Sequence, residues 1–166
     1  TARELQPDIL VNDRAGVGGD FGTPEQDIRP EDRPWEACFT MNDHWGWVPD
    51  DHNWKTSRQL IGLLCTTAAR GGNLLLNVGP MEDGRFAPQA VDRLDAIGRW
   101  MRINGEAIRG TDYCPWYGRA VGWNTQRSNG DGTWTVYLLA ARWWGTGEIT
   151  IGWVGNRVID ARLVAT

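Results

Sequence analysis

The stretch Arg70-Gly-Gly-Asn-Leu-Leu-Leu-Asn-Val-Gly-Pro80 decides the fold. Its centre, residues 74–78, is apolar apart from Asn77, and glycine or proline stands on either side. A short apolar run between turn residues is typical of a strand that is buried on both faces, as in parallel sheets. Asn77 falls near the C-terminal end of this predicted strand, where α/β sheets and barrels place their ligand sites.

Helical patterns flank the predicted strand on both sides. Pro88 is suited to the first position of the second helix, and Gly105 is suited to its end. The sequence therefore predicts helix, buried strand and helix, which is one unit of a parallel α/β fold. The apolar residues that recur at helical spacing are Trp54, Ile61, Leu64, Cys65 and Ala68 before the strand, and Val91, Leu94, Ile97, Gly98 and Met101 after it.

A second strand is predicted near the start of the chain. Residues 1–6 have the character of the last turn of a helix, which Pro7 ends. Residues 8–14 follow, with an apolar Ile-Leu-Val centre and a polar end at Arg14 and the two residues before it. Barrels place ligand sites where parallel strands end, so Arg14 is a candidate site residue. The alternative is that Arg14 pairs with an aspartate and fixes a loop.

Residues 15–26 form a glycine-rich loop whose glycine spacing does not match a dinucleotide-binding fingerprint. The loop carries Glu25, with the apolar Phe21 close by in sequence. An apolar neighbour favours the protonated carboxyl that a general acid needs, so Glu25 is a candidate acid and Asp20 a weaker one. The alternative is that Glu25 is a solvated loop residue.

Tryptophan is the compositional outlier, with 11 Trp against 3 Tyr and 3 Phe. A third predicted strand, residues 35–41, leads into Trp45-Gly46-Trp47. Indole faces are flat and amphipathic, so this pair indicates either a platform for a sugar ring or a hydrophobic plug. Gly46 would let the backbone approach a neighbour closely.

Composition limits the classes of partner. The net charge is −4 with both signs interspersed, so no basic stripe for nucleic acid is present, and no apolar run is long enough to span a membrane. Three widely spaced Cys and two His predict neither a disulfide framework nor a metal site. Because the chain begins at Thr1, with no initiator Met and no apolar leader, we expect it to be a segment of a longer protein.

The pattern changes at residue 112 to short segments separated by turns. Asn129-Gly130 and Asp131-Gly132 are strong hairpin signals. Antiparallel β-structure is therefore predicted for this part. Its expected strands are residues 120–127, 133–142, 148–154 and 157–164.

Several stretches combine into one recognisable pattern. They are Leu5-Gln-Pro-Asp-Ile-Leu-Val-Asn-Asp-Arg14 with Gly19-Asp-Phe-Gly-Thr-Pro-Glu25, Trp35-Glu-Ala-Cys38 with Trp45-Gly-Trp47, Ala69-Arg-Gly-Gly-Asn-Leu-Leu-Leu-Asn-Val-Gly-Pro80, and Asn104-Gly-Glu-Ala-Ile-Arg-Gly-Thr111. Together they resemble the retaining α-L-fucosidase family of glycoside hydrolases. The resemblance covers most of residues 1–111 and, more loosely, the β segment.

The resemblance implies an α/β fold followed by an all-β one. Residues 1–111 would be the C-terminal part of a (β/α)8-like catalytic barrel, and residues 112–166 an incomplete antiparallel β-sandwich domain. It implies hydrolysis of terminal α-L-fucose from oligosaccharides or glycoconjugates with retention of configuration. No metal or organic cofactor is implied, and the nucleophilic aspartate would stand on an earlier barrel strand, outside this chain.

The resemblance also implies roles for three residues. Glu25 would be the general acid/base, Arg14 a substrate-contacting arginine, and Trp45 an aromatic beside the fucose methyl group. Trp47 stands where the family usually has Tyr, so no role is carried over to it. We further expect Arg14 to lie apart from Glu25, because a neighbouring guanidinium favours the ionised carboxylate, whereas a general acid begins its work protonated.

Two other interpretations of the tryptophans are alternatives to the enzyme hypothesis. In one, the chain is a non-catalytic carbohydrate-binding module with a glycan platform. In the other, the tryptophans form a structural interface between the α/β part and the β part. The residues that these readings use are Trp45, Trp47, Trp123, Trp134, Trp143, Trp144 and Trp153.

Overall fold

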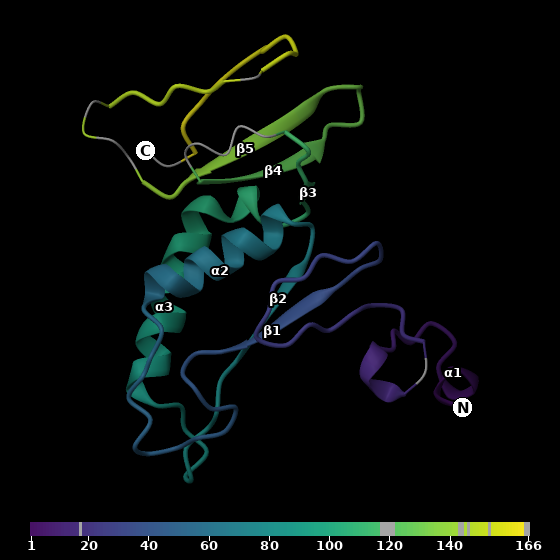
Figure 1. The fold of residues 1–166 in the computed structure, drawn as a ribbon, viewed down its shortest axis with the longest axis vertical. Coiled ribbons are helices and arrows are strands. Elements are labelled where there is room, and N and C mark those ends of the chain that lie inside the picture. The colour runs from purple at the N-terminus through teal and green to yellow at the C-terminus, as the bar shows by residue number, and fades with distance from the viewer. Residues whose placement is uncertain (17, 117–121, 143–144, 146, 153, 165–166) are drawn as a thin grey trace.

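The computed structural model describes residues 1–16, 18–116, 122–142, 145, 147–152 and 154–164 (Figure 1). Helices and strands alternate in its first part, and strands dominate the second. The elements in chain order are α1 (Ala2–Leu5), the 3₁₀ turn η1 (Asp13–Ala15), β1 (Glu36–Thr40), α2 (Ser57–Ala69), β2 (Asn73–Asn77), α3 (Pro88–Asn104), the 3₁₀ turn η2 (Gly105–Ala107), β3 (Asp112–Tyr113), β4 (Gly122–Ser128) and β5 (Trp134–Ala140).

The predicted helix–strand–helix unit is confirmed as α2, β2 and α3. Helix α2 begins at a capping box, in which the Thr56 side chain accepts from the Gln59 backbone N–H and the Gln59 side chain accepts from the Thr56 N–H. Helix α3 has Pro88 at its first position, where no backbone N–H is needed. Strand β2 pairs with β1 in parallel, over the register Glu36–Asn73 to Thr40–Asn77.

Two further extended segments continue this parallel array. Gly22 bridges Trp35 and Glu25 bridges Cys38, so residues 22–25 run alongside β1. On the other side of that segment, Asn12 bridges Phe21. All three bridges are parallel, so the order across the array is residues 11–12, residues 20–26, β1 and β2.

Two expectations about burial are wrong. Residues 8–14 do not form a buried strand: they contribute only the Asn12 bridge, and Leu10 is 74% exposed. Strand β2 is not buried on both faces, since Leu75 is 48% exposed. Leu74 and Leu76 pack into the described core clusters from one face of β2, whereas Leu75 points to the opposite face. None of residues 8–14 belongs to a described core cluster, so no packed face covers that segment.

The β part begins with an antiparallel sheet in the order β3-β4-β5, as predicted in kind. The β4–β5 hairpin turns at residues 129–133, where Gly130 and Gly132 both have positive φ. The strands expected at 148–154 and 157–164 are wrong for the described residues 148–152, 154 and 157–164. These residues pair with no strand of the sheet, and a strand persists only when its N–H and C=O groups find partners.

One face of the antiparallel sheet packs against the helices (Figure 1). Its core contains Cys65 of α2, Ala107 of η2, and Tyr137 and Leu139 of β5, with Trp123 of β4 packed against them. Trp123 therefore packs between the β part and the α/β part, as the interpretation of the tryptophans as a structural interface predicts. The partly buried residues around the same cluster also include Ile61, Trp100, Ile108 and Val164.

The tryptophans of the sheet do not form one platform. Trp123 pairs with Leu139, and Trp134 pairs with Ser128, which is five residues further along β4 than Trp123. Side chains alternate between the two faces of a sheet, so Trp123 and Trp134 lie on opposite faces. Trp134 is 53% exposed, whereas Trp123 faces the helices. Trp143, Trp144 and Trp153, which the binding-module reading also uses, lie outside the described residues.

Candidate active site

The candidate residues gather at one edge of the parallel array. Arg14 follows the bridge at residue 12, Glu25 lies at the end of the second segment, Trp45 follows β1, and Asn77 ends β2. Because the segments are parallel, these four C-terminal ends face the same edge. Three residues that the sequence analysis selected separately, Arg14, Glu25 and Trp45, thus stand at one edge of the array, and Arg14 and Glu25 are in direct contact.

Arg14 is held by its neighbours in a defined position. Its Nε donates to Thr23 Oγ1 at 2.9 Å, and its NH2 donates to the Thr23 carbonyl at 3.1 Å. Thr23 Oγ1 in turn donates to Asp13 Oδ1 at 2.6 Å, and this hydrogen bond lowers the pKa of Asp13. The guanidinium of Arg33 reaches Asp13 Oδ2 at 3.0 Å. Arg14 therefore joins the first and second segments of the array.

The expectation that Arg14 lies apart from Glu25 is wrong. Arg14 NH1 forms an ion pair with Glu25 Oε2 at 2.8 Å, between side chains that are 49% and 43% exposed. The cause is local geometry. In an extended chain, residues two apart face the same side, so the guanidinium that binds Thr23 also reaches Glu25. Glu25 therefore meets a cation in this structure.

Asp20, the weaker candidate for an acid, is used structurally. Its carboxylate accepts from Arg3 NH2 at 2.7 Å and 2.9 Å, and from the Val11 backbone N–H at 2.8 Å. The hydrogen bond from Arg3 and that from Val11 lower the pKa of Asp20, against desolvation that raises it. A carboxyl held ionised in this way is a poor proton donor at neutral pH.

Trp45 stands on a loop that is fixed to β2. Asn77 Nδ2 donates to the Trp45 carbonyl at 2.6 Å, and the indole of Trp45 is 38% exposed. Gly79 lies so close that an added Cβ would be 2.8 Å from the Gly46 carbonyl carbon and from the Trp47 nitrogen. The glycine at position 79 thus permits the close approach of the two chains. The residues that line a small pocket here are Met41, Asn42, Gly46, Trp47, Trp54, Asn77, Val78 and Gly79.

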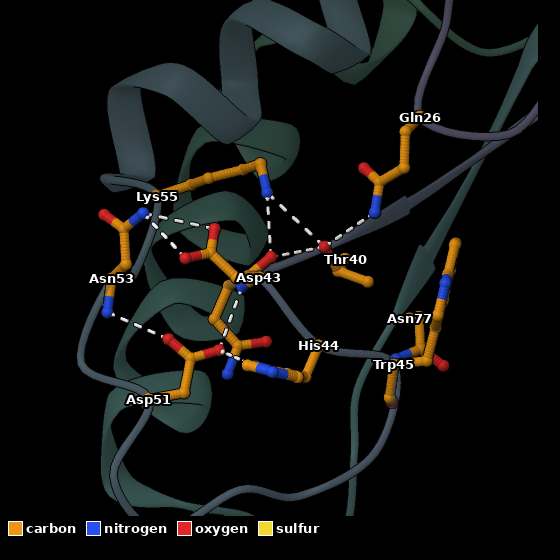
Figure 2. A network of polar contacts seen from close by, with 10 residues as sticks. Gln26, Thr40, Asp43, His44, Trp45, Asp51, Asn53, Lys55 and Asn77 are labelled. Atoms are coloured by element: carbon orange, nitrogen blue, oxygen red, sulfur yellow. Dashed lines mark hydrogen bonds and ion pairs between the residues drawn. The ribbon is translucent and has the colours of Figure 1, made fainter.

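A polar network supports the loop that carries Trp45 (Figure 2). At its centre, the Asp51 side chain is 2% exposed and accepts from the backbone N–H groups of Asp43 and Asn53, each at 3.0 Å. His44 Nδ1 lies 2.7 Å from Asp51 Oδ2, and because an ionised carboxylate only accepts, Nδ1 is the protonated ring nitrogen. The hydrogen bond from His44 lowers the pKa of Asp51, and the two backbone donors act in the same direction against burial.

The other half of the network connects β1 to the Glu25 segment. Lys55 Nζ donates to the Asn42 carbonyl at 3.1 Å and lies 3.4 Å from Thr40 Oγ1. Gln26 Nε2 donates to the same Thr40 oxygen at 2.9 Å. Sequence reasoning missed Thr40, Asp51, Lys55 and Gln26, because each acts through a contact distant in sequence and none belongs to a periodic pattern. The only signal was position, since Gln26 directly follows Glu25.

Neither a metal site nor a membrane helix is found in the part of the chain that the structure describes. No group of three or more His, Cys, Asp or Glu side chains gathers there in a way that could hold a metal ion. Among the same residues, no helix has the length and apolar character that crossing a membrane requires.

Comparison with known proteins gives a consistent result. Residues 1–106 match the family model described as alpha-L-fucosidase. A relative named alpha-L-fucosidase from Branchiostoma floridae is 31% identical over an alignment of 160 residues that covers 87% of this chain and 34% of that protein. Human tissue alpha-L-fucosidase is 34% identical over an alignment of 123 residues that covers 68% of this chain and 26% of the human protein. The chain thus spans about a third or less of the length of these relatives.

Solved structures agree with the sequence comparison. Alpha-L-fucosidase isoenzyme 1 from Paenibacillus thiaminolyticus aligns with a TM-score of 0.72 and 38% identity, over 76% of this chain and 34% of that one. The Thermotoga maritima alpha-fucosidase in complex with fucose aligns with a TM-score of 0.62 and 32% identity, over 69% of this chain and 27% of that one. By the matched family model, the sequence relatives and the shared structure, the chain belongs to the alpha-L-fucosidase family.

Proposed function

We propose that this chain supplies the acid/base and sugar-contacting residues of a retaining α-L-fucosidase. In this proposal, residues 1–111 are the C-terminal part of a (β/α)8-like barrel, and residues 112–166 belong to a β-sandwich domain. The array of parallel segments, with helix α2 connecting β1 to β2 and helix α3 following β2, supports the first assignment, and the antiparallel β3–β5 sheet supports the second. The nucleophilic aspartate would be carried by polypeptide that precedes Thr1. We refer to the complete protein as the parent enzyme.

One observation carries the proposal. The carboxylate of Glu25 and the planar cation of Arg14 form an ion pair at one edge of the array, and the exposed Trp45 follows the next strand, β1, at the same edge. Retaining glycosidases need two carboxyl groups about 5–5.5 Å apart, one as nucleophile and one as acid and then base. Glu25, at the end of the extended segment that reaches this edge, would provide the carboxyl group that acts as acid and then base.

Arg14 would exchange one hydrogen-bond partner during the catalytic cycle. Its guanidinium is a fork that can bind two acceptors at once, and here it binds Thr23 and Glu25. When fucose and the nucleophile are in place, the substrate hydroxyls and the second carboxylate compete for the same donors. Transfer of the NH1 donor to one of them would end the ion pair and leave the Glu25 carboxyl free to act as general acid toward the departing oxygen. In the second step, Glu25 acts as the base that activates water.

Trp45 would recognise the sugar. Fucose is a 6-deoxy sugar, so it presents a methyl group where galactose presents a hydroxymethyl group. An exposed indole face suits the methyl group, because the contact removes apolar surface from water. The substrate class is therefore a fucosylated glycan, and the mechanism uses amino-acid side chains without a metal or organic cofactor.

The test is Glu25→Ala in the parent enzyme. If Glu25 is the acid, its removal costs about 10²–10⁴-fold in kcat/KM for disaccharides, whose leaving groups require protonation. Aryl fucosides with acidic phenols require little protonation and keep much of their rate. The matched control is Asp27→Ala, which removes an exposed carboxylate two residues away whose ion-pair partner is Arg29. This control should leave both substrates unaffected.

Azide distinguishes the acid/base from a structural residue. Without its base, the second step slows, and the fucosyl-enzyme accumulates. Azide needs no base and fits the space that the carboxylate leaves, so it should restore turnover and give α-fucosyl azide with retained configuration. A uniform loss across leaving groups, with no azide product, would contradict the assignment of Glu25.

A further inference from the structure

The residue after Glu25 has an unusual backbone. Gln26 has φ = 53°, and it is the one non-glycine residue with positive φ among the described parts of the chain. The left-handed region is sparsely populated by side chains other than Asn and Asp, because Cβ approaches the following carbonyl oxygen. The chain ends its bridge with β1 here, since Glu25 bridges Cys38 and the Gln26 N–H donates to the Cys38 carbonyl at 2.9 Å. Contacts with neighbouring residues must therefore stabilise this turn.

The side chain of Gln26 provides the hold. Its Nε2 donates to Thr40 Oγ1 at 2.9 Å, and Thr40 is 0% exposed. The Thr40 hydroxyl also donates to the Asn42 carbonyl and lies 3.4 Å from Lys55 Nζ. A hydroxyl has one donor and two acceptor positions, so all are occupied, and Thr40 is a fixed anchor. Figure 2 shows the Gln26 amide and the Lys55 ammonium both directed at Thr40.

We propose that Gln26 is a positioning residue for the Glu25 carboxylate. The backbone bond to Cys38 and the amide bond to Thr40 hold a left-handed turn immediately after Glu25. That turn directs the carboxylate toward the edge where it meets Arg14. Backbone strain of this kind persists only where surrounding contacts enforce it, and it occurs at functional sites. The inference rests on the proposed role of Glu25 and adds a residue to it.

The turn also links Glu25 to the loop of Trp45. Thr40 is the last residue of β1, and its hydroxyl bonds to Asn42, three residues before Trp45. Gln26 and the Trp45 loop therefore depend on one buried hydroxyl. A displacement on either side of Thr40 would change the distance between the acid and the sugar platform.

The first test is Gln26→Gly in the parent enzyme. Glycine adopts positive φ without strain, so this variant removes the amide anchor without opposing the turn. We expect kcat for disaccharides to fall by about tenfold or more, because misplacement of a reacting group by an ångström costs up to about 10²-fold. KM should change little. Aryl fucosides with acidic phenols should lose much less, which a purely structural role would not produce.

The second test removes the anchor from the other side. Thr40→Val lacks the hydroxyl at nearly the same volume, and it should reproduce the leaving-group pattern of Gln26→Gly. Thr40→Ser restores the hydroxyl and should recover most of the rate. Both variants remove the same Gln26–Thr40 hydrogen bond, and Thr40→Val also removes the contacts with Asn42 and Lys55. The double variant Gln26→Gly/Thr40→Val should therefore lose no more than Thr40→Val alone. If Thr40→Val does not fold, Gln26→Gly still tests the proposal, because Gln26 is an exposed residue whose replacement leaves the core intact.

The outcomes separate this inference from the proposed function. A Gln26→Gly enzyme with wild-type rates, or with equal losses for all leaving groups, overturns the positioning role while the result for Glu25→Ala stands. If Glu25→Ala itself shows no leaving-group dependence, the proposed function fails and the positioning role fails with it. Loss confined to poor leaving groups in both variants supports both.

Discussion

Arg14 and Glu25 form an ion pair at 2.8 Å across the first two segments of the parallel array. The pair is a consequence of where Thr23 lies. Arg14 binds both the hydroxyl and the carbonyl of Thr23, and Glu25 stands two residues further along the same extended segment. One planar guanidinium thus fixes the candidate acid/base relative to the neighbouring segment, before any substrate is bound.

This geometry predicts that lysine cannot replace Arg14. A lysine ammonium is a point charge without the planar fork, so it cannot hold Thr23 and Glu25 together. We expect Arg14→Lys in the parent enzyme to lower kcat/KM by about 10–100-fold, the equivalent of one charge-assisted hydrogen bond. Arg29→Lys is the control, since Arg29 is 75% exposed and pairs only with Asp27 in the described contacts. Equal rates for wild type and Arg14→Lys would show that the fork is not used.

The isolated chain should have no fucosidase activity. The proposal places the nucleophile in polypeptide before Thr1, so residues 1–166 alone cannot form the covalent intermediate. They also leave β2 as an open edge and expose Leu10 at 74%, which favours aggregation. The measurement is hydrolysis of an aryl α-L-fucoside by the purified chain, with light scattering to follow aggregation. Measurable turnover would place the nucleophile inside these 166 residues.

The sequence predicted those elements whose signals are local. Helices α2 and α3 and strands β1 and β2 follow from periodicity and from end signals such as Pro88 and Gly105. The burial of β2 and of residues 8–14 was not predictable in the same way, because burial depends on which segments pack alongside. An apolar run shows that a strand can be buried, but not what covers it.

For the candidate site, too, the sequence predicted the residues but not the contacts between them. Arg14 and Trp45 could be chosen from sequence because each follows a predicted strand, Glu25 because it stands in a glycine-rich loop near Phe21, and all three because they match the family pattern. Their relative positions could not, and the Arg14–Glu25 contact contradicts the separation we expected. Gln26 was missed for a clear reason: glutamine has no preference for the left-handed region, so its φ of 53° is imposed by contacts with Cys38 and Thr40.

Trp45→Ala in the parent enzyme should impair fucosides more than the matching galactosides. Only fucose presents a methyl group to the indole, and a contact of this size is worth about 10–200-fold in discrimination. The measurement is the ratio of kcat/KM values for the aryl α-L-fucoside and the aryl α-L-galactoside, which differ only in the methyl and hydroxymethyl groups. Trp134→Ala, which removes a 53% exposed indole from the β5 strand, should leave the ratio unchanged. Equal losses for both sugars after Trp45→Ala would identify Trp45 as a packing residue.

Asp51 should make the stability of the parent enzyme depend on pH in the acid range. The hydrogen bond from His44, together with two backbone donors, lowers the pKa of Asp51 below the ordinary value of 3.8. A carboxyl whose pKa is lower in the folded state stabilises it fully above its unfolded-state pKa. That stabilisation is lost as the pH falls through the lowered value.

Replacing Asp51 by asparagine should therefore reduce stability at pH 6 and flatten its dependence on pH. Asparagine keeps the shape of the side chain, but its NH₂ group replaces one of the two oxygens that accept from Asp43, His44 and Asn53. The donors that face the NH₂ group then lose their acceptor. The melting temperature, measured from pH 6 down to about pH 3, should fall less steeply for Asp51→Asn than for the wild type, because this variant has no carboxyl to protonate. Asp50→Asn, an exposed neighbour, is the matched control and should follow the wild-type curve. Parallel curves for wild type and Asp51→Asn would mean that the buried carboxylate does not hold the loop of Trp45 by its charge.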